Sequence, residues 1–369
     1  MKRILIILVV MFLLLSSAYL LFRNETSRAP FLEVTNDQPS PSQSVEKLAV
    51  LARNLNIPWS IVFLPDGSAL FTQRPGQIRG LDKDGKVTSL KIQIPDVKHV
   101  GEGGLLGIAV DPKFEDNRFI YVYFTFSSDG SNTLNRVVRY KFENNQISSG
   151  KVLVGKIPGA SNHNGGRLKF GPDGFLYITT GDAQKPSQSQ DKNSLAGKIL
   201  RVDREGKSAA GNPFDNLVYS YGHRNLQGLA WNSKDMLYAT EHGPLAHDEV
   251  NRIIQGGNYG WPEIQGTQTR SGMISPLRES GLSTWAPSGA AFYNTRFFFA
   301  GLRGTAVFEA KFEGESVDLK EHFKGEFGRI RDVVLGPDNM IYILTNNTDG
   351  RGNPGPEDDR IIKIDPTKL

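Results

Sequence analysis

One hairpin unit recurs six times along the chain and limits the possible folds more than any other feature. Each copy is a short apolar strand, a turn rich in Pro, Asp, Asn and Gly, and a second strand rich in aromatic and β-branched residues. The copies begin at Ser60, Gly107, Gly166, Gly228, Ser288 and Arg331, which are 43 to 62 residues apart. A β-sandwich can also contain such hairpins, but six copies at about propeller-blade spacing predict an all-β, six-bladed β-propeller.

The first 47 residues differ from the repeats. A short basic stretch, residues 1–3, precedes 19 almost wholly apolar residues, 4–22. This length is close to that of a membrane span and exceeds the usual apolar core of a signal peptide. Residues 1–23 are expected to form an apolar helix, either a retained signal anchor or a cleaved signal peptide. Residues 24–47 are expected to be a flexible linker.

This leader predicts where the propeller, residues 48–369, resides. Either form of the leader sends the chain across the cytoplasmic membrane, so the propeller is expected in the periplasm or at the cell surface. It would stay attached to the membrane if the leader is retained.

Composition excludes several classes of function. The chain has 43 basic and 39 acidic residues, and no dense basic run follows the first few residues, so nucleic acid is not an expected partner. There is no cysteine, which excludes disulfides, thiolate catalysis and cysteine-ligated zinc.

A histidine and an aspartate flank the third hairpin. His163 lies just before its first strand and Asp182 just after its second. Because a hairpin brings its two ends together, the carboxylate can orient the imidazole and raise its basicity, as a general base requires. An ordinary hydrogen-bonded loop histidine is the alternative. No Ser or Cys nucleophile motif accompanies the pair.

Other polar residues occupy equivalent positions in other repeats, so a propeller would gather them at one rim of its channel. They are Glu102, Arg224, Asn225, Arg303, Arg329 and Arg331. Arg329 and Arg331 are two residues apart, so on a strand they would face the same way and bind one anionic group. Surface ion pairs are the alternative for any single arginine. Together the arginines predict a ligand with several carboxylates.

Residues 241–262 are rich in oxygen donors. Glu249, Tyr259 and the turn carbonyls of Gly243 and Pro244 form the mixture of carboxylate and carbonyl that hard cations such as calcium prefer. The spacing matches no EF-hand loop.

Taken together, these segments resemble the soluble glucose/sorbosone dehydrogenase family, the aldose sugar dehydrogenases that depend on pyrroloquinoline quinone (PQQ). Shared phrases occur in family order over roughly residues 51–364, among them GEGGLLGIAVDPKF, HNGGRLKFGPDGFLYITTGD, YGHRNLQGLAW, EHGP, GGNYGWP and RIRDVVLGPDN. The resemblance implies a six-bladed propeller that oxidises an aldose at its anomeric carbon to the lactone. Hydride would pass to PQQ, and an external quinone or cytochrome would accept the electrons.

The resemblance also implies roles for the residues around the expected catalytic histidine. His163 would be the base and Asp182 its support. Arg224 would stabilise charge on the quinone oxygen and, with Asn225, would contact the cofactor.

Further roles concern the cofactor carboxylates and calcium. Arg329 and Arg331 would bind the carboxylates. The carbonyls of Gly243 and Pro244 would bind the calcium that polarises the quinone, and Glu249 and Tyr259 would form a calcium site that holds the rim loop.

Two positions depart from the family pattern. Glu102 stands where a glutamine is often found, and Arg303 stands where a cofactor-contacting lysine is expected. Both departures are expected to affect substrate range and cofactor affinity. Two other functions stay open: a calcium-dependent lactonase or hydrolase, and a non-catalytic extracellular propeller that binds glycan or protein.

Overall fold

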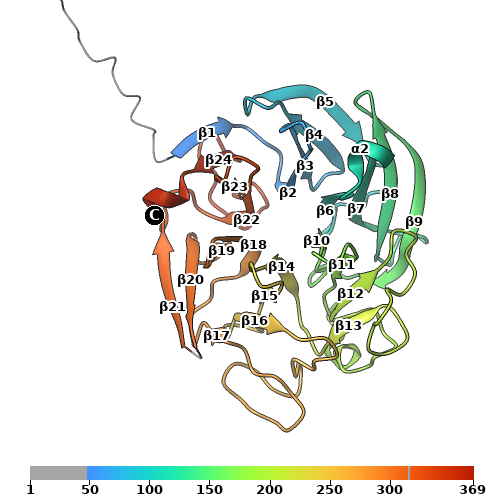
Figure 1. Cartoon of the computed structure of the whole chain (residues 1–369), viewed down its shortest axis with the longest axis vertical. Coiled ribbons are helices and arrows are strands. Elements are labelled where there is room, and N and C mark those ends of the chain that lie inside the picture. Colours follow the sequence, from blue (N-terminus) through green and yellow to red (C-terminus); the bar gives the residue numbers. More distant parts are fainter. Residues whose placement is uncertain (1–47, 315) are drawn as a thin grey trace, which may run out of the picture. The chain divides into compact units, whose positions relative to one another are not determined.

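The computed structural model describes residues 48–314 and 316–369, which form six four-stranded antiparallel sheets around a central channel (Figure 1). The six-bladed β-propeller predicted from the hairpin repeat is therefore confirmed. The predicted N-terminal helix, signal segment and linker lie outside the described residues. Within the described part, no helix is long and apolar enough to span a membrane.

The four strands of each blade lie side by side from the channel to the outer edge of the ring. In that order, blade 1 is β2 (Pro58–Phe63), β3 (Ala69–Gln73), β4 (Gln77–Leu81) and β5 (Val87–Gln93). Blade 2 is β6 (Leu105–Val110), β7 (Phe119–Phe126), β8 (Leu134–Glu143) and β9 (Gln146–Pro158). Blade 3 is β10 (Leu168–Phe170), β11 (Leu176–Thr179), β12 (Lys198–Val202) and β13 (Val218–Tyr221).

The second half of the ring follows the same order. Blade 4 is β14 (Leu226–Trp231), β15 (Leu237–Glu241), β16 (Glu249–Ile253) and β17 (Arg278–Glu279). Blade 5 is β18 (Pro287–Tyr293), β19 (Arg296–Gly301), β20 (Val307–Glu313) and β21 (Ser316–His322). Blade 6 is β22 (Ile330–Leu335), β23 (Ile341–Thr345), β24 (Ile361–Ile364) and β1 (Leu48–Ala52). The short helices are α2 (Phe114–Asn117), η1 (Pro186–Ser189) and η2 (Pro366–Lys368).

The repeated hairpin forms the two inner strands of every blade. The ring is closed by β1, which pairs antiparallel with β24, so Leu48 lies opposite Ile364 and residues from both ends of the propeller complete one blade (Figure 1). Closure in this way protects the sheet edges that an open propeller would expose.

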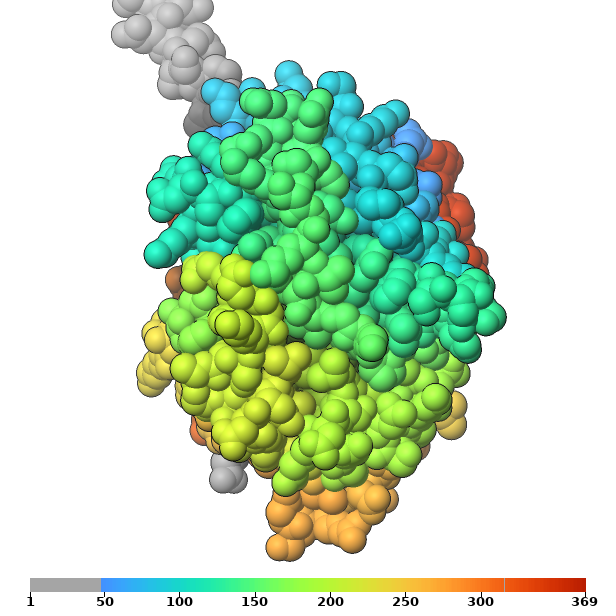
Figure 2. Space-filling model, turned by 90° about the vertical axis from the view of Figure 1, so that its right-hand side faces the viewer, coloured from blue at the N-terminus to red at the C-terminus, as the bar shows by residue number. Residues whose placement is uncertain are grey.

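Apolar side chains join neighbouring blades. Phe298 of blade 5 packs in one cluster with Val333, Ile343 and Ile362 of blade 6, and all four are fully buried. Burying a side chain of this size contributes roughly 1.5–3 kcal/mol. From the side, neighbouring blades pack closely, while the segment between β16 and β17 projects from the edge of the ring (Figure 2).

β-bulges interrupt the inner strands close to where they begin. The pairing register shifts between Pro58 and Ser60, between Leu226 and Gly228, and between Ile330 and Asp332. A bulge redirects the side chain of its extra residue. The residues concerned are Trp59, Gln227 and Arg331, which meet near the axis. Arg331 lies within β22, whereas Arg329 precedes this strand.

Candidate active site

A cavity of about 460 Å³ opens at the mouth of the channel where the inner strands begin. We call it the arginine cavity, because its lining contains Arg224, Arg303, Arg329, Arg331 and Arg351. Among the described residues, two carboxylates, Glu102 and Asp248, line it with them, so this lining carries a net charge of +3 with histidines neutral. Such a cavity favours an anionic ligand that carries several charges.

His163 and Asp182 lie together, as the hairpin predicts. His163 Nδ1 is 2.7 Å from Asp182 Oδ1. Asp182 is fully buried and also accepts from Gln184 N at 2.8 Å and from Trp261 Nε1 at 2.9 Å. Because the carboxylate accepts on both oxygens, His163 Nδ1 is the donor of their shared hydrogen bond. The lone pair then belongs to Nε2, on a side chain that lines the cavity.

A close backbone approach fixes the position of His163. His163 has a positive φ of 62°, and its carbonyl comes so close to Gly181 that a Cβ at Gly181 would lie 2.0 Å from it. Only glycine fits there. Gly181 therefore holds the histidine loop against the strand that leads to Asp182.

The other described histidine–carboxylate pairs near this region differ in accessibility. His223 is fully buried, with Nδ1 2.9 Å from Glu241 Oε2 and Nε2 2.9 Å from Ser220 Oγ. Both of its nitrogens are therefore engaged. His247 pairs with Glu279 at 2.8 Å and lines a neighbouring small cavity instead. His163 is the one of these three that lines the arginine cavity.

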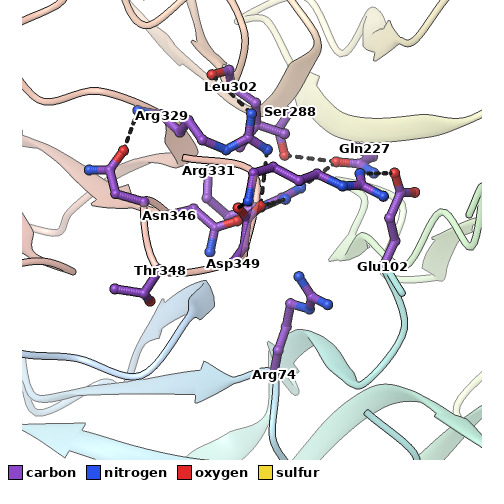
Figure 3. A network of polar contacts seen from close by, with 12 residues as sticks. Arg74, Glu102, Gln227, Ser288, Leu302, Arg329, Arg331, Asn346, Thr348 and Asp349 are labelled. Atoms are coloured by element: carbon purple, nitrogen blue, oxygen red, sulfur yellow. Dashed lines mark hydrogen bonds and ion pairs between the residues drawn. The ribbon is translucent and has the colours of Figure 1, made fainter. Parts of the chain in front are cut away.

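Arg329 and Arg331 both approach Asp349, a residue that the sequence did not single out (Figure 3). Arg329 Nη2 is 3.0 Å and Arg331 Nη2 is 4.0 Å from Asp349 Oδ2. The two guanidiniums thus face one carboxylate of the protein itself. Their shared side does not come from alternation on one strand, because Arg329 precedes β22 and a bulge directs Arg331. Binding of a ligand carboxylate by this pair stays a prediction.

Arg331 is held by neutral oxygens. Its Nη1 donates to Gln227 Oε1 at 2.6 Å and its Nη2 to Asn346 Oδ1 at 2.9 Å. Burial lowers the pKa of Arg331 to about 9, and the Asp349 charge only partly offsets this. The Asp349 carboxylate stays 4.0 Å from Arg331 Nη2 and neutralises this buried guanidinium only in part, so an incoming anion would stabilise it.

Several buried polar atoms at this mouth have no hydrogen-bond partner within the described part of the chain. Three belong to residues that line the cavity: Asn225 Nδ2, His242 Nε2 and Arg329 Nε. Arg74 Nε and Asn346 Nδ2 also lack partners there, and Figure 3 shows both residues beside the cluster. Unpaired buried donors are rare in folded proteins and indicate a missing ligand or water.

Arg224 and Asn225 face the same cavity. Arg224 Nη1 donates to the carbonyl of His242 at 3.2 Å, and its Nη2 is 3.5 Å from the carbonyl of Pro244. Burial lowers the pKa of Arg224, opposed by Asp182. Asn225 Oδ1 accepts from Gly165 N at 3.1 Å.

Glu102 and Arg351 close one side of the mouth. Arg351 bonds to Glu102 Oε1, and its Nη2 donates to Asn162 Oδ1 at 2.7 Å, so it links blade 6 to blades 2 and 3. Burial would raise the pKa of Glu102, but the Arg351 hydrogen bond and the charge of His242 hold it at about 2. Arg303 is exposed at the mouth.

The predicted metal-binding residues surround a second, much smaller cavity of about 10 Å³, which is lined by Gly243, Pro244, Glu249 and Tyr259. This is about the space of one water-sized particle. Burial, with the charge of Glu241, raises the pKa of Glu249 well above its ordinary value. Asn251 Nδ2 donates to Glu249 Oε2 at 2.9 Å, and Asn251 Oδ1 has no partner among the described residues.

The Tyr259 hydroxyl does not contribute to this site. It donates to the carbonyl of Arg252 at 2.6 Å and accepts from Ile254 N at 2.8 Å, so only the Tyr259 carbonyl is suited to bind a cation. Asp248 is also engaged elsewhere, since its Oδ2 accepts from Thr284, Trp285 and Ala286. Within residues 48–314 and 316–369, no three His, Asp or Glu side chains are grouped so as to hold a metal by themselves.

The functional residues that sequence reasoning missed have two origins. Gln227 sits in a bulge, and a strict alternation does not predict where its side chain points. Asp349 and Arg351 belong to the loop between β23 and β24, whose course no repeat or turn motif indicates.

Known proteins share this fold and these segments. The Glucose / Sorbosone dehydrogenase family profile matches residues 55–354. Aldose sugar dehydrogenase YliI of Escherichia coli (strain K12) is 32% identical over 334 residues, which cover 82% of this chain and 90% of that protein. Quinoprotein glucose dehydrogenase B of Acinetobacter calcoaceticus is 32% identical over 264 residues, which cover 63% of this chain and 55% of that protein.

A solved structure is similar as well. The PQQ-bound form of aldose sugar dehydrogenase from Streptomyces coelicolor superposes with a TM-score of 0.81 at 40% identity, over 86% of this chain and 97% of that one. The chain therefore belongs to the glucose/sorbosone dehydrogenase family. This confirms the resemblance and the predicted class of enzyme, a sugar dehydrogenase of the quinoprotein type. The roles of individual residues stay predictions.

Proposed function

We propose that this chain oxidises an aldose at its anomeric carbon to the lactone, with PQQ as the hydride acceptor and His163 as the general base. The observation that carries the proposal is the cavity itself: an oriented imidazole beside a cluster of arginines whose buried donors lack partners within the described residues.

The residues of the arginine cavity fit PQQ, a planar tricarboxylic acid. The lining has more arginines than carboxylates, which suits a ligand with several carboxylates, and the volume lies within the usual range for ligand pockets. Arg329 and Arg331 would hold carboxylates, while Arg224 and Asn225 would hold the quinone side. When bound, PQQ supplies a two-electron acceptor for hydride.

The protein's own part in the reaction is proton removal and positioning. His163 Nε2 would accept the proton of the C1 hydroxyl as the C1–H bond breaks and the hydride leaves. Asp182 would stabilise the imidazolium that forms, since it is held by donors from Gln184 and Trp261. Arg224 would stabilise negative charge that develops on the acceptor oxygen.

Calcium fits the small cavity beside Glu249. The buried Glu249 carboxylate lies in the field of Glu241, and a divalent cation would remove this repulsion. The Glu249 carboxylate and the Tyr259 carbonyl would bind one ion. The carbonyls of Gly243 and Pro244, which line both cavities, would bind calcium toward the cofactor. Calcium there would supply Lewis-acid polarisation of the quinone.

Two expectations concern the cellular setting. The apolar leader favours an extracytoplasmic enzyme, attached to the membrane if the leader is retained. An external quinone or cytochrome would then accept the electrons and return the cofactor to its oxidised state.

The direct test is reconstitution. The purified full chain is mixed with PQQ and calcium, and dye reduction is followed across a panel of aldoses. We expect activity that requires both PQQ and a sugar. An inactive protein that nevertheless binds glycans would favour the non-catalytic alternative, and lactone hydrolysis without PQQ would favour the lactonase.

A further inference from the structure

The channel has another large cavity, of about 520 Å³, where the inner strands end. All six inner strands contribute to its lining, so it lies on the axis like the arginine cavity but at the opposite end of these strands. We call it the lysine cavity; its polar lining residues include Ser60, Arg167, Lys169 and Asp332.

Two cations in the lysine cavity have unused hydrogen-bonding capacity. Arg167 is 5% exposed, and its Nη2 has no partner within the described residues. Within the described residues, the hydrogen-bond acceptors of Lys169 Nζ are two backbone carbonyls, that of Leu229 at 3.2 Å and that of Ala290 at 3.5 Å. Burial lowers the pKa of Lys169 to about 8, so the ammonium still predominates at neutral pH.

The carboxylates that line this cavity are already engaged. Asp332 Oδ2 accepts from Arg167 Nη1 at 3.0 Å and from Ile61 N at 3.2 Å. Asp111 accepts from Tyr121 at 2.6 Å and from Arg204 at 3.1 Å. Lys169 is therefore the cation of this lining that has no carboxylate within 4 Å in the described part of the chain.

Apolar side chains make up most of the remaining wall. Phe63, Phe170, Leu229 and Val334 all line the cavity. A fully charged ligand such as a phosphate would leave this surface uncovered, whereas an apolar ligand would leave Lys169 without a carboxylate and Arg167 Nη2 without an acceptor.

We propose that the lysine cavity is a second ligand site, which binds a small monocarboxylate with an apolar body. The carboxylate would lie between Lys169 Nζ and Arg167 Nη2, and the body would pack on Phe63, Phe170 and Val334. The site does not depend on the proposed sugar oxidation.

A thin layer separates the two cavities. The ring centroid of Trp59 lies 4.3 Å from the Arg167 guanidinium and 5.8 Å from that of Arg331. The backbone carbonyl of Gln227 accepts from Arg167 Nε at 2.9 Å, while its side chain accepts from Arg331. Ligands at the two ends would thus bind to different residues while sharing this layer.

Calorimetry with octanoate tests the proposal, with 1-octanol and octylamine as neutral and cationic probes of the same body. We expect saturable binding of octanoate but not of 1-octanol or octylamine. Lys169→Met should weaken it at least about tenfold, because a hydrogen bond to a charged group is lost. Lys169→Arg should retain it, and Lys113→Met, which changes an exposed lysine nearby, should leave it unchanged.

A melting curve of each variant shows whether it is folded. If Lys169→Met does not fold, octanoate binding by Lys169→Arg still tests the proposal. Competition with PQQ locates the probe: octanoate should bind equally well to PQQ-loaded protein. Absence of saturable octanoate binding, equal binding of 1-octanol, or displacement of octanoate by PQQ would each overturn the proposal.

Discussion

The two ends of the central channel are built from the same six strands, yet they differ sharply in chemistry. At the end where the strands begin, five arginines surround a histidine, and buried donors lack partners among the described residues. At the end where the strands finish, the wall is mostly apolar and two cations remain. The contrast shows that a propeller separates a multiply charged site from a nearly apolar one by the thickness of a single side-chain layer.

The difference has a structural cause. Long loops enter the strands at the arginine end and carry residues across blades, as Arg351 does when it reaches Glu102, 249 positions away in the chain. Tight turns of the Gly-Pro-Asp type leave the strands at the other end, so its lining consists of strand residues and the residues directly next to them. Reactive groups are thus expected at the loop end, as in other enzymes built on rigid scaffolds.

The largest expected effect concerns the base at the arginine end. His163→Ala should lower the sugar oxidation rate by about 10²–10⁴-fold, because general base catalysis contributes that much. PQQ affinity, melting temperature and octanoate binding at the opposite end should all persist. Steady-state kinetics, calorimetry and thermal melts measure these four properties.

Asp182→Asn provides a graded comparison, since it disturbs orientation but leaves the imidazole in place. Its activity should lie between those of wild type and His163→Ala. If the sugar oxidation rate of His163→Ala lies within a few-fold of the wild-type rate, His163 is not the general base. Losses of activity that follow losses of melting temperature would indicate a structural role.

The second effect concerns anion binding. Arg331→Ala should weaken PQQ binding at least about tenfold, because a charged hydrogen bond in a buried site is worth roughly 1.5–3 kcal/mol. Arg53→Ala, which removes an exposed ion pair with Glu357, is the control. If calorimetry shows that Arg331→Ala binds PQQ as tightly as wild type, Arg331 does not bind the cofactor.

A third effect concerns calcium. Glu249 has a raised pKa in the folded protein, so folding costs free energy at any pH at which this carboxyl is ionised in the unfolded chain, neutral pH included. Glu249→Gln should therefore raise the melting temperature in chelator and abolish the increase that calcium gives to wild type. Glu263→Gln, at an exposed carboxylate of the projecting segment, should behave like wild type. Identical wild-type melting curves in chelator and calcium would contradict the site.

The smallest effect concerns pH. Burial lowers the pKa of His242 from 6.5 to about 4, so the unfolded chain takes up a proton over this range while the native protein does not. The free energy of unfolding should fall as pH drops from about 6.5 to about 4. Denaturant titrations of cofactor-free protein should show a weaker pH dependence in His242→Gln. An unchanged pH dependence would mean that His242 is protonated in the native state.

The fold and part of the candidate site could be predicted from the sequence. The repeat predicted six blades because each hairpin carries its own turn and alternation, and the same hairpin logic placed His163 beside Asp182. It did not reach Asp349 or Arg351, because loop conformation depends on tertiary contacts rather than on a period. It also missed Gln227, since a bulge breaks the alternation that would orient its side chain.

Anaerobic mixing of PQQ-loaded protein with an aldose tests the central claim, sugar oxidation at the arginine end, most directly. The account predicts that the spectrum of the bound quinone changes to that of its reduced form in one turnover. The change should be slower with sugar deuterated at C1 and far slower in His163→Ala. A quinone spectrum that the sugar leaves unchanged, in protein shown to bind both, would contradict the account.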